Sequence, residues 1–273
     1  RSHFQIPVIG ITGSNGKTIV KEWLFQLLRP DMNIVRSPKS YNSQVGVPLS
    51  VWQMHDDHQL AIFEAGISRP GEMEHLSGII RPTLGIFTNI GAAHDESFQS
   101  REQKIDEKLS LFAQVNKLIY CKDYTALHEA VQRRSSSGNE QECFTWSRRT
   151  RADLQVGRVT KSSDETEIQG VFRNSFIDIR IPFTDDASVE NAIHCWATML
   201  SMDLDQAVIH ERMAYLSPVA MRLEMKNGIN NCSVINDSYN SDLGSLTIAL
   251  DFLNQQRQHE RRTLIFSDIL QSG

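Results

Sequence analysis

The feature that most constrains this chain is a glycine-rich turn between a predicted strand and a predicted helix. Residues 7–12, PVIGIT, form a short apolar run that is typical of a strand. Residues 13–18 read GSNGKT, and over residues 17–28 apolar side chains recur on one helical face. The strand, the two glycines and the helix are therefore expected to fold as one unit.

Three more apolar runs predict further strands of the same sheet. They span residues 59–66, 83–90 and 117–122, and a helix is predicted between the last two, at roughly 100–113. Near-continuous apolar strands are typical of parallel sheets that helices cover on both faces. The alternation of strands and helices predicts a doubly wound, mainly parallel α/β sheet with a P-loop-type turn.

A polar loop at 133–142 separates this region from a different pattern. Residues 153–183 alternate in the manner of an antiparallel β region, and helices are predicted near 188–202 and 204–216. We expect residues 1–217 to form one domain that combines the parallel sheet with this added β region.

A second unit is expected over residues 218–273. CSVIND reads as a strand, GSLTIALDFLNQQ as a helix and RTLIFSD as another strand, which is how a Rossmann-like α/β unit begins. Two strands and one helix are too little for an independent core of this class. The sequence therefore predicts an incomplete Rossmann-like unit after residue 217.

Composition excludes several classes of function. The 273 residues carry 28 basic and 33 acidic side chains, a net charge of −5, whereas proteins that grip nucleic acid are usually basic. No apolar run approaches the roughly 18–20 residues that span a bilayer. The four cysteines are scattered, which fits free thiols in a reducing cytoplasm. We expect a cytoplasmic protein with no nucleic-acid or membrane partner.

The turn itself has the chemistry of a phosphate-binding loop. In the usual pattern, G-x-x-x-x-G-K-[ST], the first glycine would stand at Ile11, but here it stands at Gly13. Glycines let backbone N–H groups face phosphate oxygens, while Lys17 can neutralise the phosphates and Thr18 can ligate Mg²⁺. The predicted ATP-binding residues are Gly13, Ser14, Asn15, Gly16, Lys17 and Thr18. The alternative is a glycine turn with an exposed lysine, and the loop alone does not choose among kinases, ATPases, GTPases and ligases.

Stretches along the whole chain then resemble one family, the Mur ligases, which are ATP-dependent amide ligases of bacterial cell-wall synthesis. The resemblance begins with GITGSNGKT, whose first glycine is in the family's position, and it continues through six more segments. These are YNSQVGVPLS, FEAGISRPGEM, TNIGAAHDESFQS, EKLSLF, MRLE and NDSYNSDLGS. The DSYN run resembles the branch that adds D-alanyl-D-alanine to UDP-N-acetylmuramoyl-tripeptide, which would be the two substrates. Other Mur ligases and the folylpolyglutamate synthases usually carry different residues after this aspartate, so the run argues against a folylpolyglutamate or cyanophycin synthetase.

The resemblance implies a metal site near the turn. Glu64 ends an apolar strand, where ligands gather in parallel sheets, and it matches the family's metal-binding glutamate. His94 matches a second metal ligand, although Mg²⁺ prefers oxygen. Lys108 matches a lysine that the family carboxylates, and helical spacing alone would also let Lys104 point inward. Asn89 is expected in the same pocket.

Three more residues are implied on the nucleotide itself. Arg222 matches the arginine that the C-terminal domain brings to the phosphates, and Asp237 matches the aspartate that holds the ribose hydroxyls. Asn191 matches an adenine-side asparagine, although Ala187 and Ser188 replace the histidine and first asparagine that accompany it in the family. The catalytic set implied by the family is Lys17, His94, Lys108 and Arg222.

The resemblance also implies that an N-terminal domain for the sugar nucleotide and the rest of the C-terminal domain are missing here. We expect a fragment that does not complete the reaction alone. Two alternatives stay open: another ATP-dependent amide ligase of the superfamily, or a nucleotide-binding module without catalysis.

Overall fold

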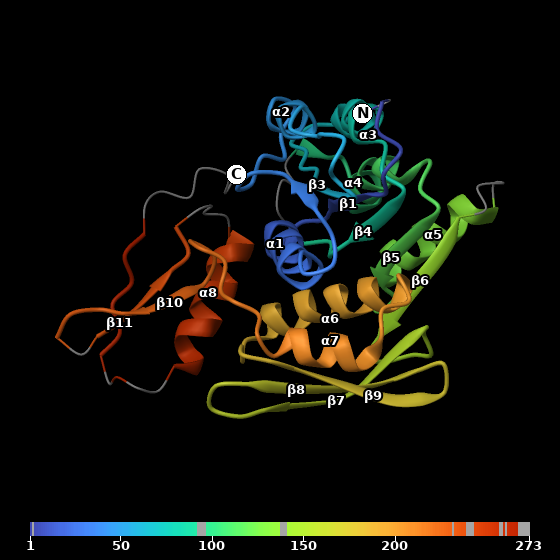
Figure 1. Ribbon diagram of the computed structural model, residues 1–273. Helices are drawn as coiled ribbons and strands as arrows, with labels where there is room; N and C mark the ends of the chain where they lie inside the picture. Colours follow the sequence, from blue (N-terminus) through green and yellow to red (C-terminus); the bar gives the residue numbers. More distant parts are fainter. Residues whose placement is uncertain are drawn as a thin grey trace.

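A nine-stranded sheet organises most of the chain in the computed structural model, which describes residues 1, 3–91, 97–136, 141–230, 232–238, 243–256, 259 and 261–266. The strand order is β2-β3-β1-β4-β5-β6-β7-β8-β9 (Figure 1). Pairing is parallel from β2 to β7 and antiparallel from β7 to β9. The strands are β1 Val8–Thr12, β2 Ile34–Arg36, β3 Leu60–Glu64, β4 Leu84–Phe87, β5 Lys117–Cys121, β6 Glu142–Ser147, β7 Leu154–Lys161, β8 Thr166–Phe172 and β9 Ser175–Ile181.

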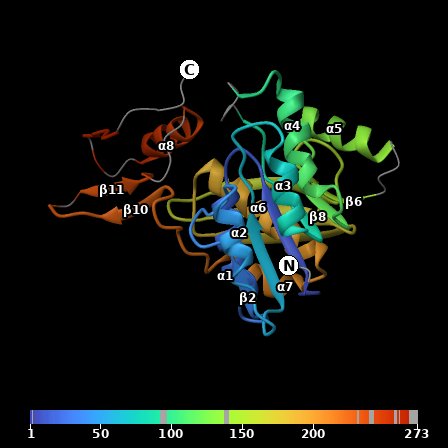
Figure 2. The same cartoon turned by 90° about the horizontal axis from the view of Figure 1, so that it is seen from above.

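Helices cover both faces of the parallel part, as its fully buried strands require. One hydrophobic core joins the sheet to α1, α6 and α7, and a second core joins the opposite face to α2, α3, α4 and α5 (Figure 2). The helices are α1 Lys17–Leu28, α2 Gly46–Val51, α3 Glu72–Ile80, α4 Arg101–Leu109, α5 Thr125–Ser136, α6 Asp186–Ser201 and α7 Gln206–Met213, and a 3₁₀ turn, η2 Ser110–Phe112, follows α4.

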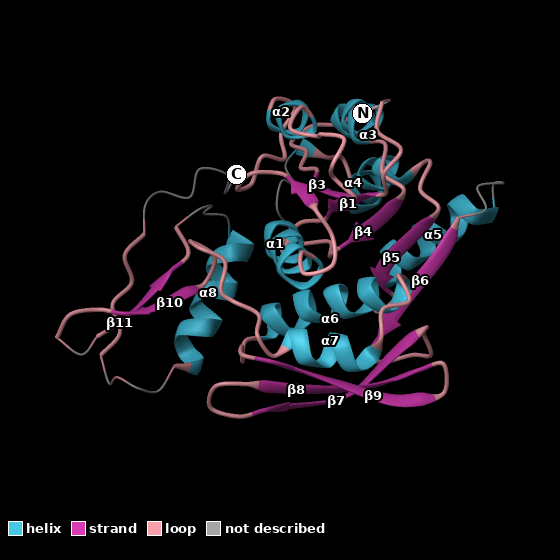
Figure 3. Ribbon diagram, viewed as in Figure 1, coloured by secondary structure: helices cyan, strands magenta, loops and turns pink. Residues whose placement is uncertain are grey.

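Helix α6 is buried on nearly all sides, because the antiparallel strands β7–β9 pass along it away from the parallel sheet (Figure 3). Thirteen of its sixteen residues are buried, among them Trp196 in full. The indole N–H of Trp196 donates to Gln206 Oε1 at 3.0 Å. A helix this apolar all round needs cover on more than one face, which explains the added β region.

A small unit follows α7. Strands β10 (Glu224–Asn227) and β11 (Ser233–Asn236) pair antiparallel, and α8 (Leu243–Gln255) comes next. Among the described residues, no helix is both long enough and apolar enough to cross a bilayer.

The predicted fold class is confirmed: a mostly parallel sheet carries an antiparallel region and helices on its faces. Two local predictions are wrong. Residues 133–136 belong to α5 and residue 142 begins β6, rather than forming a loop, and residues 137–140 lie outside the described residues. Residues 262–266, predicted as a strand, pair with no strand in the part of the chain that the structure describes. Residues 267 and 268 of that prediction lie outside the described residues.

Candidate functional site

The glycine turn lies at the carboxyl end of β1, in the middle of the parallel sheet. β1 has β3 on one side and β4 on the other. The strands β2 and β3 thus extend the sheet in one direction from β1, and β4 and the later strands extend it in the other. Open α/β sheets bind ligands at such a switch point, outside the carboxyl ends of the strands. The predicted site residues are therefore expected to meet here.

Both glycines of the turn occupy positions that admit no side chain. Gly13 has φ +148°, and a Cβ there would lie 2.0 Å from Thr88 Oγ1. Gly16 has φ +81°, and a Cβ there would lie 2.2 Å from Asn191 Oδ1. Helix α1 begins directly after Gly16 with no side-chain cap and no acidic residue in its first turn. Its first N–H groups and its dipole thus face the turn, which suits an anion.

Asn89 ties the turn to the end of β4. Its backbone oxygen accepts from Ser14 N and its Oδ1 accepts from Asn15 N, both at 2.9 Å. Gly91 N donates to Ser14 Oγ, also at 2.9 Å. The structure therefore brings the predicted residues Ser14, Asn15 and Asn89 together, and the hydrogen bonds of Asn89 hold the turn in shape.

Three lysines converge on carbonyl oxygens around the turn. Lys17 Nζ donates to Gly13 O at 2.8 Å and to Ser14 O at 2.9 Å, and Lys108 Nζ donates to Gly13 O at 3.1 Å. Lys104 Nζ donates to Gly91 O at 2.6 Å. Burial lowers the pKa of Lys108 well below its usual value, and the charges of Lys17 and Lys104 lower it further. Both lysines of α4 are buried, as helical spacing allowed, and their amines donate to backbone oxygens at the turn and at Gly91.

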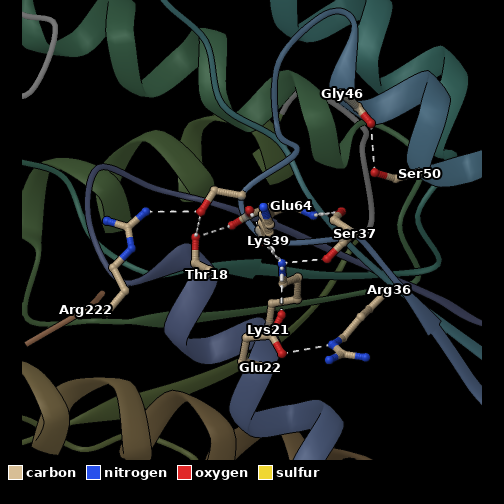
Figure 4. Close-up of polar contacts among 11 residues, drawn as sticks. Thr18, Lys21, Glu22, Arg36, Ser37, Lys39, Gly46, Ser50, Glu64 and Arg222 are labelled. Atoms are coloured by element: carbon tan, nitrogen blue, oxygen red, sulfur yellow. Dashed lines mark hydrogen bonds and ion pairs between the residues drawn. The ribbon is translucent and has the colours of Figure 1, made fainter. Parts of the chain in front are cut away.

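Thr18 and Glu64 meet on the α1 side of the turn (Figure 4). The Thr18 hydroxyl donates to Glu64 Oε2 at 2.9 Å. Since its single hydrogen is used there, Thr18 accepts from Ser40 at 3.0 Å, and Ser40 in turn accepts from Arg222 Nη2 at 3.2 Å. The hydrogen bonds therefore run in one direction, from the guanidinium to the carboxylate.

Glu64 also has an oxygen that no hydrogen bond satisfies. Its Oε1 is buried and is the one buried side-chain N or O atom without a hydrogen-bond partner in the described part of the chain. Such an atom in a native site calls for an explanation, and a bound ion is one of them. With the Thr18 hydroxyl beside it, the donor set is oxygen only, which is what Mg²⁺ prefers.

Lys21 completes this side of the site, although the sequence reasoning did not single it out. Its Nζ lies 3.7 Å from Glu64 Oε1, and the side chains of both residues are fully buried. It also donates to the backbone oxygens of Ser37, at 2.7 Å, and Lys39. One signal was present in the sequence: Lys21 shares a helical face with the core residue Leu24 and follows Thr18 by one turn.

Asn191 lies on the other side of the turn, in α6, with its amide against Gly16. Its neighbour Glu190 accepts from Tyr124 at 2.7 Å and lies 3.5 Å from the Asn89 amide. Burial raises the pKa of Glu190, while these hydrogen bonds oppose that rise. Glu190 and Tyr124 were not predicted, because their contact joins segments that are 66 residues apart.

His194 lies one turn further along α6, fully buried. The Trp146 indole N–H donates to its Nδ1 at 3.2 Å, so Nε2 carries the proton and donates to Thr88 O at 2.7 Å. Burial lowers the pKa of His194 to about 4. A neutral imidazole with a fixed tautomer therefore supports the end of β4.

Two predicted residues, Arg222 and Asp237, belong to the segment after α7. A third predicted residue, His94, lies outside the described residues. Arg222 reaches the site through Ser40. Asp237 Oδ1 accepts from Leu223 N at 3.2 Å, a contact within the small unit itself. His94 is not among the described residues, which stop at 91 and resume at 97. Among described residues, no three His, Cys, Asp or Glu side chains cluster as a metal site.

Comparisons with known proteins point to one family. The family profile "Mur ligase middle domain" matches residues 11–199, more than half of the chain. The chain is 28% identical over 271 residues to the UDP-N-acetylmuramoyl-tripeptide–D-alanyl-D-alanine ligase of Bacillus subtilis, covering 97% of this chain and 57% of that protein. The ligase of the same name from Rickettsia prowazekii is also 28% identical, with 100% and 61% covered. The chain thus spans less than two thirds of these curated relatives.

Solved structures share the fold. A crystal structure of MurF from Acinetobacter baumannii gives a TM-score of 0.82 at 23% identity, covering 94% of this chain and 56% of that one. The crystal structure of MurF ligase from Thermotoga maritima in complex with ADP gives 0.80 at 21% identity, covering 93% and 58%.

Proposed function

The chain belongs to the Mur ligase family, and on that premise we propose that it carries the nucleotide site of an ATP-dependent amide ligase. The single observation that supports this most directly is Glu64 Oε1, a buried carboxylate oxygen without a hydrogen bond, beside the Thr18 hydroxyl. A metal that accompanies ATP would account for it. When bound, Mg²⁺ neutralises charge on the transferred phosphoryl group.

The substrates proposed for the whole ligase are UDP-N-acetylmuramoyl-tripeptide and D-alanyl-D-alanine. The two curated relatives above carry those substrates in their names, and the DSYN run after β11 resembles the same branch. The peptide carboxylate attacks the γ-phosphorus of ATP, which gives an acyl phosphate and ADP. The amine of D-alanyl-D-alanine then attacks the acyl carbon, and phosphate leaves. The product would be a precursor of the cell wall.

The residues of this chain have distinct parts in the proposed reaction. Both partners of the first step are anions, so positive charge contributes more than a base does. Lys17 would move from the loop carbonyls onto the phosphates, and Arg222 would add charge from the segment after α7. Asn191 would contact the adenine, and Asp237 the ribose. His94 would be a second metal ligand.

Lys108 is proposed as the carboxylated lysine. Its buried position and the lowered pKa of its amine favour a neutral nitrogen. The nitrogen would attack CO₂, forming a C–N bond and releasing one proton, and the carbamate would then pair with a metal or with Lys17. We further propose that residues 1–217 form the central ATP-binding domain and residues 218–273 the start of the C-terminal domain.

Binding of a fluorescent ATP analogue, with and without Mg²⁺, tests the nucleotide site. We expect Mg²⁺-dependent binding that Lys17→Ala abolishes, because Lys17 is the lysine of the phosphate loop. Lys161→Ala, at an exposed lysine of β7, is the matched control and should bind normally. Equal binding by all three proteins would contradict the proposal.

A coupled phosphate-release assay tests the substrates. In the whole ligase, release should require both the tripeptide precursor and D-alanyl-D-alanine, whereas a folate substrate with glutamate should give none. Residues 1–273 alone are expected not to turn over. Release with glutamate instead would favour the folylpolyglutamate type, and nucleotide binding without any release would favour the non-catalytic module.

A further inference from the structure

Lys21 neutralises Glu64 without bonding to it. Two of its three N–H groups donate to the carbonyls of Ser37 and Lys39, and Glu22 Oε1 lies 3.2 Å away as an ion-pair partner. Glu64 Oε1 lies further off, at 3.7 Å, beyond hydrogen-bond distance. The ammonium group of Lys21 therefore offsets the negative charge of Glu64, while the lone pairs of Oε1 stay available to a metal ion.

The charges around Glu64 are balanced. Glu22 Oε2 accepts from Arg36 Nε at 2.9 Å, so two carboxylates, Glu22 and Glu64, face two cations, Lys21 and Arg36. Among the described residues, the other side-chain oxygens that hydrogen-bond to Glu64 are the hydroxyls of Thr18 and Ser37, which are neutral. A divalent cation arriving alone at Glu64 would thus meet no excess negative charge from the described residues.

We propose that Lys21 is a positioning residue that makes metal binding at Glu64 depend on bound nucleotide. This inference rests on the proposed function and deepens it. Proteins bind Mg²⁺ mostly through one or two carboxylates completed by substrate phosphates. Here a single carboxylate, Glu64, is available, and Lys21 offsets its charge. The phosphates therefore have to supply the other ligands and the negative charge that hold the metal.

The opposite wall of the turn supports the same order of binding. Lys17 donates to a carbonyl of the turn and Lys104 to the carbonyl of Gly91 beside it, and this pair of amines attracts a polyphosphate and repels a free divalent cation. The nucleotide then brings both the metal and the negative charge that holds it. Lys21 prevents the metal from occupying Glu64 beforehand and keeps the carboxylate aimed at the turn.

A purely structural role is the competing explanation. Lys21 fixes the loop after β2 by its bonds to Ser37 O and Lys39 O, and that role would need the hydrogen bonds rather than the charge. The two roles separate in Lys21→Gln, which can still donate to a carbonyl but carries no charge, and in Lys21→Arg, which keeps the charge.

The experiment uses Mn²⁺ as the probe, with electron paramagnetic resonance to count the bound ion. Each protein is titrated in the absence of nucleotide and again with a non-hydrolysable ATP analogue. The unmodified chain and Lys21→Arg should bind Mn²⁺ only with the analogue. Lys21→Gln should bind free Mn²⁺ about tenfold more tightly or better, because a nearby positive charge is gone. The double variant Lys21→Gln/Glu64→Gln should lose that gain.

Each outcome decides. If the unmodified chain binds Mn²⁺ as tightly without the analogue as with it, the inference is overturned, whether or not the variants fold. If folded Lys21→Gln shows no gain, the charge has no such role and the structural explanation stands. Analogue binding without metal is measured separately by fluorescence, so its failure would count against the proposed function instead.

Discussion

The two sides of the phosphate loop differ in how their buried polar side chains are paired. On the α1 side, which we define as Thr18, Lys21, Ser40 and Glu64, a buried carboxylate faces a buried ammonium group. On the α6 side, defined as Asn89, Glu190, Asn191 and His194, hydrogen bonds rather than an ion pair engage the polar side chains. The α1 side should therefore respond to changes of charge, and the α6 side to shape and protonation.

Removing the carboxylate charge of the α1 side should have the largest effect. Glu64→Gln keeps the shape but leaves Lys21 without a fully buried counter-charge, which costs about 3–5 kcal/mol of the free energy of unfolding. Urea unfolding at pH 7 measures it. Glu74→Gln, at an exposed position of α3, is the control and should change little. If Glu64→Gln and Glu74→Gln have the same free energy of unfolding, the α1 side does not depend on the charge of its buried carboxylate.

Protonation should distinguish the α6 side. Because burial lowers the pKa of His194 from 6.5 to about 4, only the unfolded chain takes up this proton between those pH values. The free energy of unfolding is thus fully retained above pH 6.5 and loses about 3 kcal/mol as the pH falls to 4. His194→Gln should flatten this slope, whereas His75→Gln, at an exposed histidine, should not. Unchanged slopes in both variants would contradict a neutral buried imidazole.

The sequence predicted what depends on local pattern. Helix α1 begins and ends where its apolar spacing indicated, at Lys17 and Leu28, and the glycine turn lies where strand meets helix. Glu64 was expected at a strand end, and it ends β3. These features need only the neighbours in the chain and the two periodicities of regular structure.

The sequence could not predict what depends on distant segments. Lys21 is explained by carbonyls at the end of β2 and by a carboxylate at the end of β3, which only the folded sheet brings together. The run Leu264–Phe266 has strand composition, but it has no partner strand among the described residues and leaves its side chains largely exposed. Apolar composition alone does not make a strand, because the backbone needs a ladder of hydrogen bonds.

Steric crowding should give the next largest effect on the α6 side. Gly16→Ala combines a positive φ with a Cβ that meets the Asn191 amide, and we expect a loss of about 2 kcal/mol of unfolding free energy. Gly71 is a matched control: it also precedes a helix, at φ +85°, but nothing lies within 4 Å of its Cβ position. Gly71→Ala should therefore lose only about 1 kcal/mol, from the backbone term. Thermal and urea unfolding compare them, and equal losses would exclude the contact with Asn191.

The smallest expected effect tests the hydrogen-bond chain of the α1 side. In Ser40→Ala the Thr18 hydroxyl still donates to Glu64, so the loss should be only about 1 kcal/mol of unfolding free energy. The sharper measurement is a double-mutant cycle with Arg222→Ala, whose own effect should shrink by about 0.5–1 kcal/mol once Ser40 is gone. Arg212→Ala, which breaks an ion pair outside the site, should have the same effect in both backgrounds. If Arg222→Ala also has the same effect in both, Ser40 does not connect the guanidinium to the carboxylate. The α1 side would then be a local ion pair rather than a path from the segment after α7 to the phosphate loop.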